Sequence, residues 1–251
     1  MTRIVNIILF LTTLFTGCQT NYVVSEKKSG FIEVKNESQD EKINKLIQPY
    51  RDSLKDEMET VIGTSEMEMK TGEPESLLGN FVCDLMILYN KKNWEEGNKV
   101  NHPTIALMNQ RGLRAPLPKG EIKIKHIFEI MPFENTINLV SLTGKVILLM
   151  AKFLAENGGH PISSNFKMIV EKDKSFTVTI DGNPIDSNGI YTVVTSDYLF
   201  SGGDNMKFFK DHYSKTETLY KFRDLLIDMI IYYSSEDLKI TSQLDGRITF
   251  K

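Results

Sequence analysis

A helix that is apolar around most of its circumference places the strongest constraint on the fold of this chain. The pattern predicts this helix over residues 75–93, after a polar break at residues 70–74 that contains Gly and Pro. Such a helix is stable only when other elements cover it on several sides. The sequence therefore predicts a central, buried helix. Its apolar positions are Leu77, Leu78, Phe81, Val82, Leu85, Met86, Leu88 and Tyr89.

Further strands and helices are expected along the rest of the chain. Short apolar runs and alternating patterns predict strands over residues 61–69, 105–108, 122–124, 136–142, 166–170, 176–180 and 191–195. Helical spacing predicts helices over residues 42–59, 144–156 and 219–233, and a helical turn at residues 126–129. The helix over 144–156 is expected to bury Val146, Leu149, Met150 and Phe153. Because no repeat and no linker follows residue 40, residues 41–251 are expected to form a single mixed α+β domain.

Composition excludes several other classes of protein. Of the 251 residues, 41% are hydrophobic and 25% are charged, as in globular proteins and unlike collagen-like, disordered or coiled-coil chains. The formal net charge is −3, so the chain has no basic surplus to neutralise the phosphates of DNA or RNA. We therefore expect no nucleic acid polymer as a partner.

The first residues predict export and attachment to a membrane. Residues 1–17 contain Arg3 and then an apolar run too short to span a bilayer, which is typical of a signal peptide. The run ends in Gly17 and Cys18, and this end resembles a bacterial lipobox, in which the Cys is lipidated. We therefore expect Cys18 to anchor the protein in the bacterial cell envelope on the periplasmic face, and Gln19 favours the outer membrane. The alternative is an ordinary secretory signal with a chance Cys.

A polar segment separates Cys18 from the expected domain. Residues 18–40 are rich in Ser, Glu, Lys, Asn and Gln, which is typical of a tether. The segment is apolar at residues 23, 24, 31, 32 and 34, so a short pair of strands over residues 23–24 and 31–34 is the alternative.

The sequence lacks the motifs of several classes of enzyme. None of its four histidines lies in an Asp-x-His, His-x-His or His-Glu-x-x-His arrangement. There is no Gly-x-Ser-x-Gly nucleophile elbow and no phosphate-binding loop that ends in Gly-Lys-Ser/Thr. Cys83 lies among apolar helical residues and is expected to be a buried hydrophobic residue rather than a nucleophile. We therefore expect no metal, no cofactor and no catalytic residue in this chain.

A polar turn after a buried strand is one candidate for ligand binding. Residues 109–114 offer the amide of Asn109 and the guanidinium groups of Arg111 and Arg114. Guanidinium groups bind carboxylates and phosphates, and Gly112 allows the backbone to approach a ligand closely. The turn therefore suits a polar or anionic ligand, and the alternative for Arg114 is a structural ion pair.

Two aromatic residues on separate turns are a second candidate. Phe133 follows a proline, and Tyr198 lies on a segment that continues through Gly202, Gly203 and Asp204. Two facing rings can hold a flat heterocycle, each contributing about 1–3 kcal/mol by stacking. The structural alternatives are a core position for Phe133 and a merely tight turn at residues 202–204. The spacing alone does not decide between these alternatives.

Taken together and in order, segments of the chain resemble a known family. These segments are residues 75–86, 109–114, 117–122, 132–135, 142–144, 191–204 and 245–248. They resemble the C-terminal domain of 5'-nucleotidases over about residues 40–251. The resemblance implies an α/β domain that binds a nucleoside. In that family, a separate metallophosphoesterase domain holds two metals and cleaves the phosphate ester.

The resemblance also implies roles for individual residues. Phe133 and Tyr198 match the aromatic pair that stacks the base, with Tyr standing where Phe is common. Asn109 matches an amide that contacts the base. Arg114 matches an arginine near the ribose and phosphate, and Asp204 an acid that accepts hydrogen bonds from the ribose. The expected substrate-binding residues are Asn109, Arg111, Arg114, Phe133, Tyr198, Gly202, Gly203 and Asp204.

The chain departs from the family pattern in three ways. The turn at residues 109–114 usually reads Asn-Gly-Gly-Gly-Ile-Arg, whereas Gln110 and Arg111 replace two glycines here. These two residues would close the pocket or add a contact to an anion. Pro74 stands where the family often has an Arg. The metal ligands and the catalytic His-Asp pair of the metallophosphoesterase domain are not found in residues 1–40.

We therefore expect this chain to be the nucleoside-binding part of a split 5'-nucleotidase, with a nucleoside or nucleoside monophosphate as its ligand. A separate metallophosphoesterase subunit would carry the divalent metals, and the chain alone would be inactive. Two alternatives stay open. One is a nucleoside-binding lipoprotein for uptake or sensing without catalysis, and the other is a structural protein with a decayed pocket. The sequence does not determine the preferred base.

Overall fold

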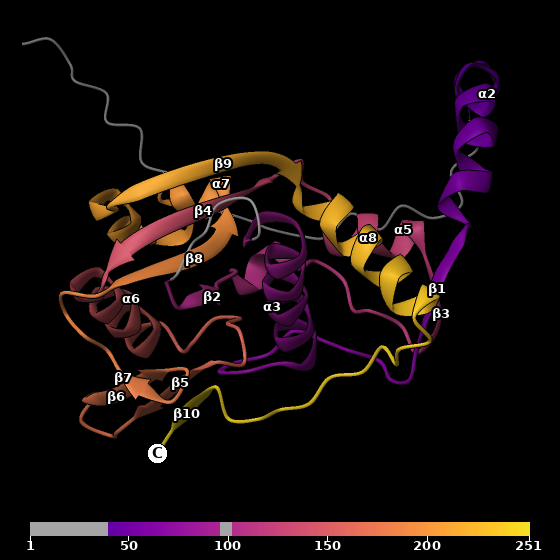
Figure 1. Cartoon of the computed structure of the whole chain (residues 1–251). Helices are drawn as coiled ribbons and strands as arrows, with labels where there is room; N and C mark the ends of the chain where they lie inside the picture. Colours follow the sequence, from indigo (N-terminus) through magenta and orange to yellow (C-terminus); the bar gives the residue numbers. More distant parts are fainter. Residues whose placement is uncertain (1–39, 96–101) are drawn as a thin grey trace, which may run out of the picture. The chain divides into compact units, whose positions relative to one another are not determined.

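The computed structural model describes residues 40–95 and 102–251 (Figure 1). The predicted signal peptide, Cys18 and residues 18–39 of the predicted tether lie outside the described residues. Internal contacts divide the chain between Ile47 and Gln48 into two compact units. The division falls within helix α2, Glu41–Met58, which matches the predicted helix to within a residue and contains Pro49 in its interior.

A four-stranded mixed sheet forms the middle of the part that begins at Gln48 (Figure 1). Its strands are β2 (Thr104–Ala106), β8 (Ile190–Ser196), β4 (Thr136–Thr143) and β9 (Ser214–Lys221), in that order. Strand β2 runs parallel to β8, whereas β4 is antiparallel to both of its neighbours.

Strand β9 was not predicted, and the helix predicted from residue 219 begins only at Phe222. The reason is that β9 is a largely exposed edge strand with polar side chains, so that it carries no apolar period. Leu219, which we expected to begin the helix, is 78% exposed and has a positive φ of 56°.

Successive side chains along the strands of this sheet belong alternately to two separate hydrophobic clusters. On β8, Val193 belongs to one cluster and Val194 to the other. On β4, Val140 belongs to the same cluster as Val193, and Leu139 belongs to the same cluster as Val194. Because successive side chains of a strand point to opposite faces, the sheet is covered on both faces. The part of the chain from Gln48 onward is therefore a mixed α/β structure, in agreement with the predicted fold class.

One face of the sheet packs against helices α3 (Leu77–Asn90), α5 (Ile124–Ile130) and α8 (Phe222–Ser235). The antiparallel pair β1 (Val61–Ser65) and β3 (Gly120–Lys123) adjoins α8. Helix α3 is the predicted buried helix, and nine of its 14 residues are buried. It begins at Leu77 because the Ser76 side chain caps it, with Oγ accepting a hydrogen bond from Gly79 N over 3.2 Å.

The other face packs against helix α6 (Gly144–Glu156) and a second sheet. That sheet has the order β10 (Ile248–Phe250), β5 (Phe166–Val170), β6 (Phe176–Ile180) and β7 (Asn183–Pro184). The expectation that Leu149 faces inward is wrong, because this side chain is 50% exposed. The buried face of α6 is instead centred on Ile147, Met150 and Leu154.

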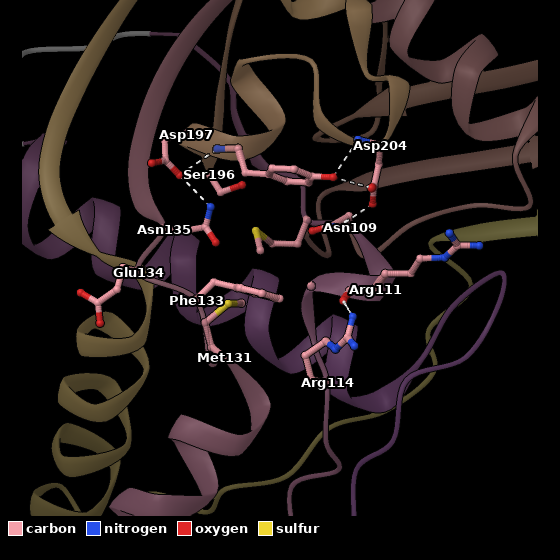
Figure 2. Close-up of a pocket in the computed structure, with 13 residues that line it drawn as sticks. Asn109, Arg111, Arg114, Met131, Phe133, Glu134, Asn135, Ser196, Asp197 and Asp204 are labelled. Atoms are coloured by element: carbon pink, nitrogen blue, oxygen red, sulfur yellow. Dashed lines mark hydrogen bonds between the residues drawn. The ribbon is translucent and has the colours of Figure 1, made fainter. Parts of the chain in front are cut away.

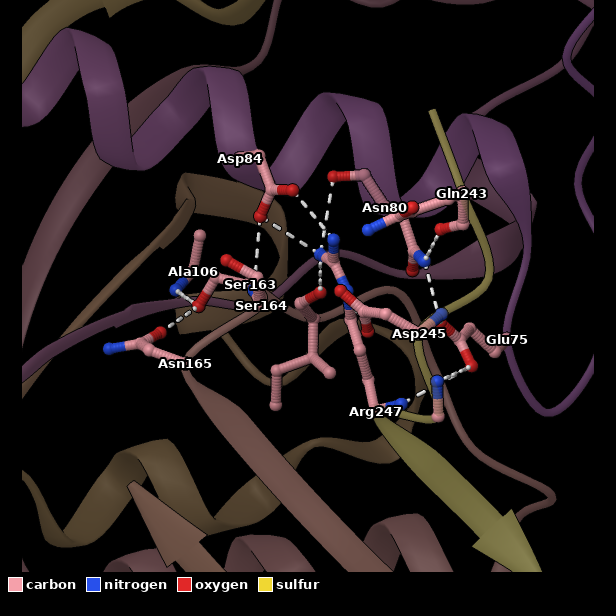
Figure 3. A network of polar contacts seen from close by, with 12 residues as sticks. Glu75, Asn80, Asp84, Ala106, Ser163, Ser164, Asn165, Gln243, Asp245 and Arg247 are labelled. Carbon is pink, nitrogen blue, oxygen red and sulfur yellow. Dashed lines mark hydrogen bonds and ion pairs between the residues drawn. The ribbon is translucent and has the colours of Figure 1, made fainter. Parts of the chain in front are cut away.

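A network around Arg247 ties the C-terminal segment to α3 (Figure 3). Arg247 is 2% exposed, and its two terminal nitrogens donate to the two carboxylate oxygens of Asp84 over 2.9 and 2.6 Å. The Glu75 carboxylate accepts hydrogen bonds from the backbone N–H groups of residues 245–247. The backbone N–H groups of residues 245–247 and the Arg247 side chain therefore have hydrogen-bond partners in Glu75 and Asp84. These bonds hold the segment that leads into β10 in place beside β5.

Candidate functional site

The candidate binding residues meet at one edge of the central sheet. Strands β2 and β8 are parallel, so their carboxyl ends lie at the same edge. Strand β4 is antiparallel to β8, so its amino end lies there too. The turn at residues 109–114 follows β2, residues 133–135 precede β4, and residues 197–204 follow β8. The topology of the sheet thus assembles segments that are far apart in the sequence.

These segments enclose a cavity of about 560 Å³ (Figure 2). Six of the predicted site residues line it, namely Asn109, Arg111, Arg114, Phe133, Tyr198 and Asp204. The remaining two, Gly202 and Gly203, lie on the turn between Tyr198 and Asp204 and are not part of the lining. The structure therefore brings the predicted residues together from all three segments.

The two aromatic side chains are exposed to the cavity rather than buried in the core. Phe133 and Tyr198 are each 46% exposed. Figure 2 shows Phe133 and Asp204 on different sides of the opening, and the Tyr198 hydroxyl is bonded to Asp204. The structural alternative for Phe133, a place in the core, is thus wrong. Both rings are available to a flat ligand.

The Asp204 carboxylate is held by a neutral donor on each oxygen. Oδ1 accepts a hydrogen bond from the Tyr198 hydroxyl over 2.8 Å, and Oδ2 accepts one from Asn109 Nδ2 over 2.7 Å. The bond to Asp204 raises the pKa of the Tyr198 hydroxyl. Each carboxylate oxygen can accept a further hydrogen bond. Asp204 is therefore oriented in advance and can still accept hydrogen bonds from a ligand.

Two glycines allow these side chains to take their positions. A Cβ atom on Gly203 would lie 2.5 Å from the Tyr198 ring, and a Cβ atom on Gly112 would lie 2.5 Å from Asn109 Oδ1. Neither approach is possible for a larger residue without displacement of its neighbour. Gly203 thus acts on the cavity through Tyr198, even though it does not line the cavity.

The two arginines supply positive charge at the rim of the cavity. Within the described residues, neither Arg111 nor Arg114 forms an ion pair, so the structural alternative for Arg114 is not observed. Arg114 Nη1 donates to the Arg111 carbonyl over 3.4 Å, and its Cζ lies 6.0 Å from the centre of the Phe133 ring. By contrast, Glu134 on the same cavity is paired with Lys221 and Arg223. The basic groups of the rim therefore remain available to an anion.

Several lining residues were not predicted. Asn135, Ser196 and Asp197 form one corner of the cavity, where Asp197 Oδ1 accepts hydrogen bonds from Asn135 Nδ2 over 2.9 Å and from Tyr198 N over 2.7 Å. The sequence offered one indication of these three residues, because each lies next to a predicted site residue or at the end of a predicted strand. Which strands pair cannot be read from those positions, so the contact between Asn135 and Asp197 was missed.

The residues that depart from the expected family motif leave the cavity open. Neither Gln110 nor Pro74 is part of the lining, and the cavity persists with Arg111 on its rim. The backbone N–H of Gln110 donates to His160 Nδ1 over 3.5 Å, and the His160 ring stacks on Phe153 with centroids 5.9 Å apart. Burial lowers the pKa of His160. Of the two alternatives for Gln110 and Arg111, closure of the pocket is therefore not observed, and a contact from Arg111 to an anion stays a prediction.

Three further features of the described residues concern the buried cysteine, metal ligands and membrane-spanning helices. Cys83 is fully buried, as predicted, and burial raises the pKa of its thiol. In the ranges 40–95 and 102–251, no group of three or more His, Cys, Asp or Glu side chains is arranged to hold a metal ion. Within the same ranges, no helix combines the length and the apolar character that crossing a bilayer requires.

Sequence comparisons relate the chain to enzymes that act on nucleotides. The family model of the 5'-nucleotidase C-terminal domain matches residues 59–211. The chain is 25% identical to rat 5'-nucleotidase over 197 residues, which are 70% of this chain and 33% of that protein. It is also 25% identical to the trifunctional nucleotide phosphoesterase YfkN of Bacillus subtilis over 242 residues, which are 89% of this chain and 15% of that protein. The chain thus spans a third or less of the length of these relatives.

Structural comparison agrees with the sequence matches. The 5'-nucleotidase precursor of Thermus thermophilus superposes with a TM-score of 0.69 at 23% identity, covering 82% of this chain and 42% of that one. The NAD nucleotidase of Haemophilus influenzae gives a TM-score of 0.62 at 17% identity, covering 86% of this chain and 42% of that one. The predicted fold and family resemblance are confirmed.

Proposed function

The chain belongs to the family of 5'-nucleotidase C-terminal domains, and from this premise we propose that its cavity binds the nucleoside part of a nucleotide. The observation that carries the proposal is the convergence of Phe133, Tyr198 and Asp204 on one cavity. A nucleoside has a flat base that can stack on aromatic rings and a ribose with hydroxyl donors. The cavity offers both kinds of partner.

The charges of the cavity support a nucleotide as well as a nucleoside. Arg111 and Arg114 lie on the rim without an acidic partner among the described residues, and guanidinium groups bind phosphate well. Asp204 instead suits the neutral hydroxyl groups of the ribose, because a carboxylate accepts hydrogen bonds from them. The base would stack against the rings of Phe133 and Tyr198.

We propose that a metallophosphoesterase unit on a separate polypeptide cleaves the phosphate ester. The described residues do not fit a metal site, since they contain no suitable group of ligands. The role of this chain is therefore to bind and orient the nucleotide. In an assay with AMP, the chain alone should release no phosphate, and adding the metal-bearing partner should restore release. Phosphate release by the purified chain alone would contradict this division of labour.

Binding by the cavity is tested by the effect of adenosine on thermal unfolding. A ligand that binds only the folded state raises Tm, and the rise grows with its concentration. At the same concentration, adenosine should raise the Tm of Phe133→Ala by less than it raises the Tm of the wild type. Because Phe133 is 46% exposed, the variant should still unfold cooperatively without ligand. Equal stabilisation of both proteins would contradict a role for Phe133 in binding.

The place of action is also a proposal. Lipidation of Cys18, which lies outside the described residues, would hold the protein on the periplasmic face of a bacterial envelope, with the outer membrane favoured. A lipid-anchored protein needs no membrane-spanning helix. Cys18→Ser should move the protein from the membrane fraction to the soluble fraction and abolish its labelling by radioactive palmitate. Retention of the label in the variant would exclude Cys18 as the lipidated residue.

A further inference from the structure

Asp197 fixes the orientation of the Asn135 side chain at one end of the cavity. Its Oδ1 atom accepts a hydrogen bond from Asn135 Nδ2 over 2.9 Å. An ionised carboxylate has acceptors but no donors, so that only the NH₂ end of the amide can face it. The amide oxygen of Asn135 is consequently held on the opposite side. Figure 2 shows this oxygen turned toward the open space beside Phe133.

Ser196 adds a donor to the same end of the cavity. Its side chain is 2% exposed and lines the cavity, and its Oγ accepts a hydrogen bond from Leu199 N over 3.2 Å. Within the described part of the chain, no acceptor takes the hydroxyl proton of Ser196. In the strand register, Ser196 pairs with Ile137, two residues beyond Asn135, so both side chains belong to the same edge. This end therefore offers an acceptor from Asn135 and a donor from Ser196.

We propose that Asp197 makes the site select bases that carry an amino group next to an unprotonated ring nitrogen. The proposal rests on the nucleoside function proposed above. In adenine and cytosine the amino group would donate to Asn135, and the ring nitrogen would accept from Ser196. Hypoxanthine and uracil present a carbonyl oxygen at that place, and two acceptors repel each other. Asp197 is thus a positioning residue, since it acts on the base through Asn135.

The restraint by Asp197 is what makes the selection possible. A free amide can turn over and exchange its donor for its acceptor, so that an unrestrained Asn135 would serve amino and carbonyl bases alike. With Asp197 present, the turned amide would place its oxygen against the carboxylate. That arrangement loses a hydrogen bond and adds repulsion between two acceptors. The orientation of Asn135 is therefore set before a ligand enters.

Matched ligands test this selection by calorimetric titration. Adenosine and inosine differ in an amino or a carbonyl group and in the protonation of the adjacent ring nitrogen, as do cytidine and uridine. For the wild type we expect each amino compound to bind about tenfold more tightly than its partner, which is about 1.4 kcal/mol, the scale of one hydrogen bond that is lost or opposed. Asp197→Ala should reduce both ratios to within about threefold, because the amide becomes free to turn.

A second variant and a control keep the test independent of folding. Asn135→Ala removes the acceptor but leaves the hydrogen bond from Tyr198 N to Asp197. In this variant the amino and carbonyl compounds should bind with about equal affinity. Asp186→Ala is the matched control, because Asp186 accepts a backbone hydrogen bond from Asn188 N on an exposed turn outside the cavity. This control should retain the wild-type ratios.

The outcomes separate this proposal from the proposed function. Equal binding of the amino and carbonyl partners by the wild type would overturn the selection while leaving nucleoside binding intact. Retention of the wild-type ratios by Asn135→Ala, or by a folded Asp197→Ala, would overturn the role of this pair. Failure of all four nucleosides to bind the wild type would overturn the proposed function itself, and the selection with it.

Discussion

The Tyr198 hydroxyl donates a hydrogen bond to Asp204 Oδ1 over 2.8 Å, which links an aromatic ring that lines the cavity to a carboxylate that lines it too. Asn109 holds the other oxygen of Asp204 from the turn after β2. The ring of Tyr198 and the carboxylate of Asp204 therefore keep a fixed relation before any ligand is present. Such preorganisation lowers the entropic cost of binding.

Tyr198→Phe tests the contribution of this hydroxyl. The variant keeps the ring but loses one hydrogen bond to a carboxylate in a half-exposed site, worth about 0.5–1.5 kcal/mol. The affinity for adenosine should therefore fall by about two- to tenfold, as measured by calorimetric titration. Because the Tyr198 side chain is 46% exposed, the variant should still unfold cooperatively without ligand, with only a small fall in Tm. Unchanged affinity would show that the hydroxyl does not orient the site.

Gly203→Ala should impair binding without adding any group to the cavity. The new Cβ atom would lie 2.5 Å from the Tyr198 ring, so the ring has to move. The affinity for adenosine should approach that of a variant that lacks the ring. Gly72→Ala is the matched control, because its Cβ atom would meet its nearest neighbours at 3.8 Å, an ordinary contact. Wild-type affinity in Gly203→Ala would contradict the packing of Tyr198 on this glycine.

Arg247→Ala should destabilise the protein far more than removal of a surface ion pair. The change leaves Asp84 and the buried carbonyl of Ile162 without their shared donor. The expected loss is about 2–4 kcal/mol, below the range for a fully buried pair because Asp84 is 40% exposed. Urea unfolding measures this loss. Lys251→Ala, which breaks an exposed pair with Glu171, is the control and should change the free energy of unfolding by less than about 1 kcal/mol.

The burial of His160 predicts a dependence of stability on pH. Burial lowers the pKa of His160 in the folded protein below its ordinary value of about 6.5. Below that pH the unfolded chain takes up a proton that the folded chain does not, so stability falls as the pH drops under about 6.5. His160→Asn should remove this part of the loss between pH 7.5 and pH 5.0 in urea unfolding. His102→Asn, at an exposed histidine, should leave the loss unchanged.

Strong periodic patterns were sufficient to predict much of the fold. Helix α3 was predicted because its apolar side chains surround the helix, and strands β5 and β6 because both combine short apolar runs with turn signals. Strand β9 was missed because an exposed edge strand carries no such pattern. Periodicity reports burial, so it cannot detect an element whose side chains stay in solvent.

The candidate site likewise contains residues that could be predicted from the sequence and residues that could not. Asn109, Phe133, Tyr198 and Asp204 were predicted from their motifs, and strand pairing brings them to one cavity. The pair of Asn135 and Asp197 could not be predicted, because it depends on the register of β4 against β8. Hydrophobic patterns indicate that strands exist, but they do not specify which residues on two distant strands face each other.

The most direct test of the central claim is a calorimetric titration of the purified protein with adenosine and AMP, repeated with Tyr198→Ala. The account predicts saturable binding to the wild type and an affinity about five- to 150-fold lower in the variant, since stacking on one ring contributes about 1–3 kcal/mol. An absence of heat up to millimolar ligand, or equal affinity in the two proteins, would contradict a nucleoside site between these aromatic rings.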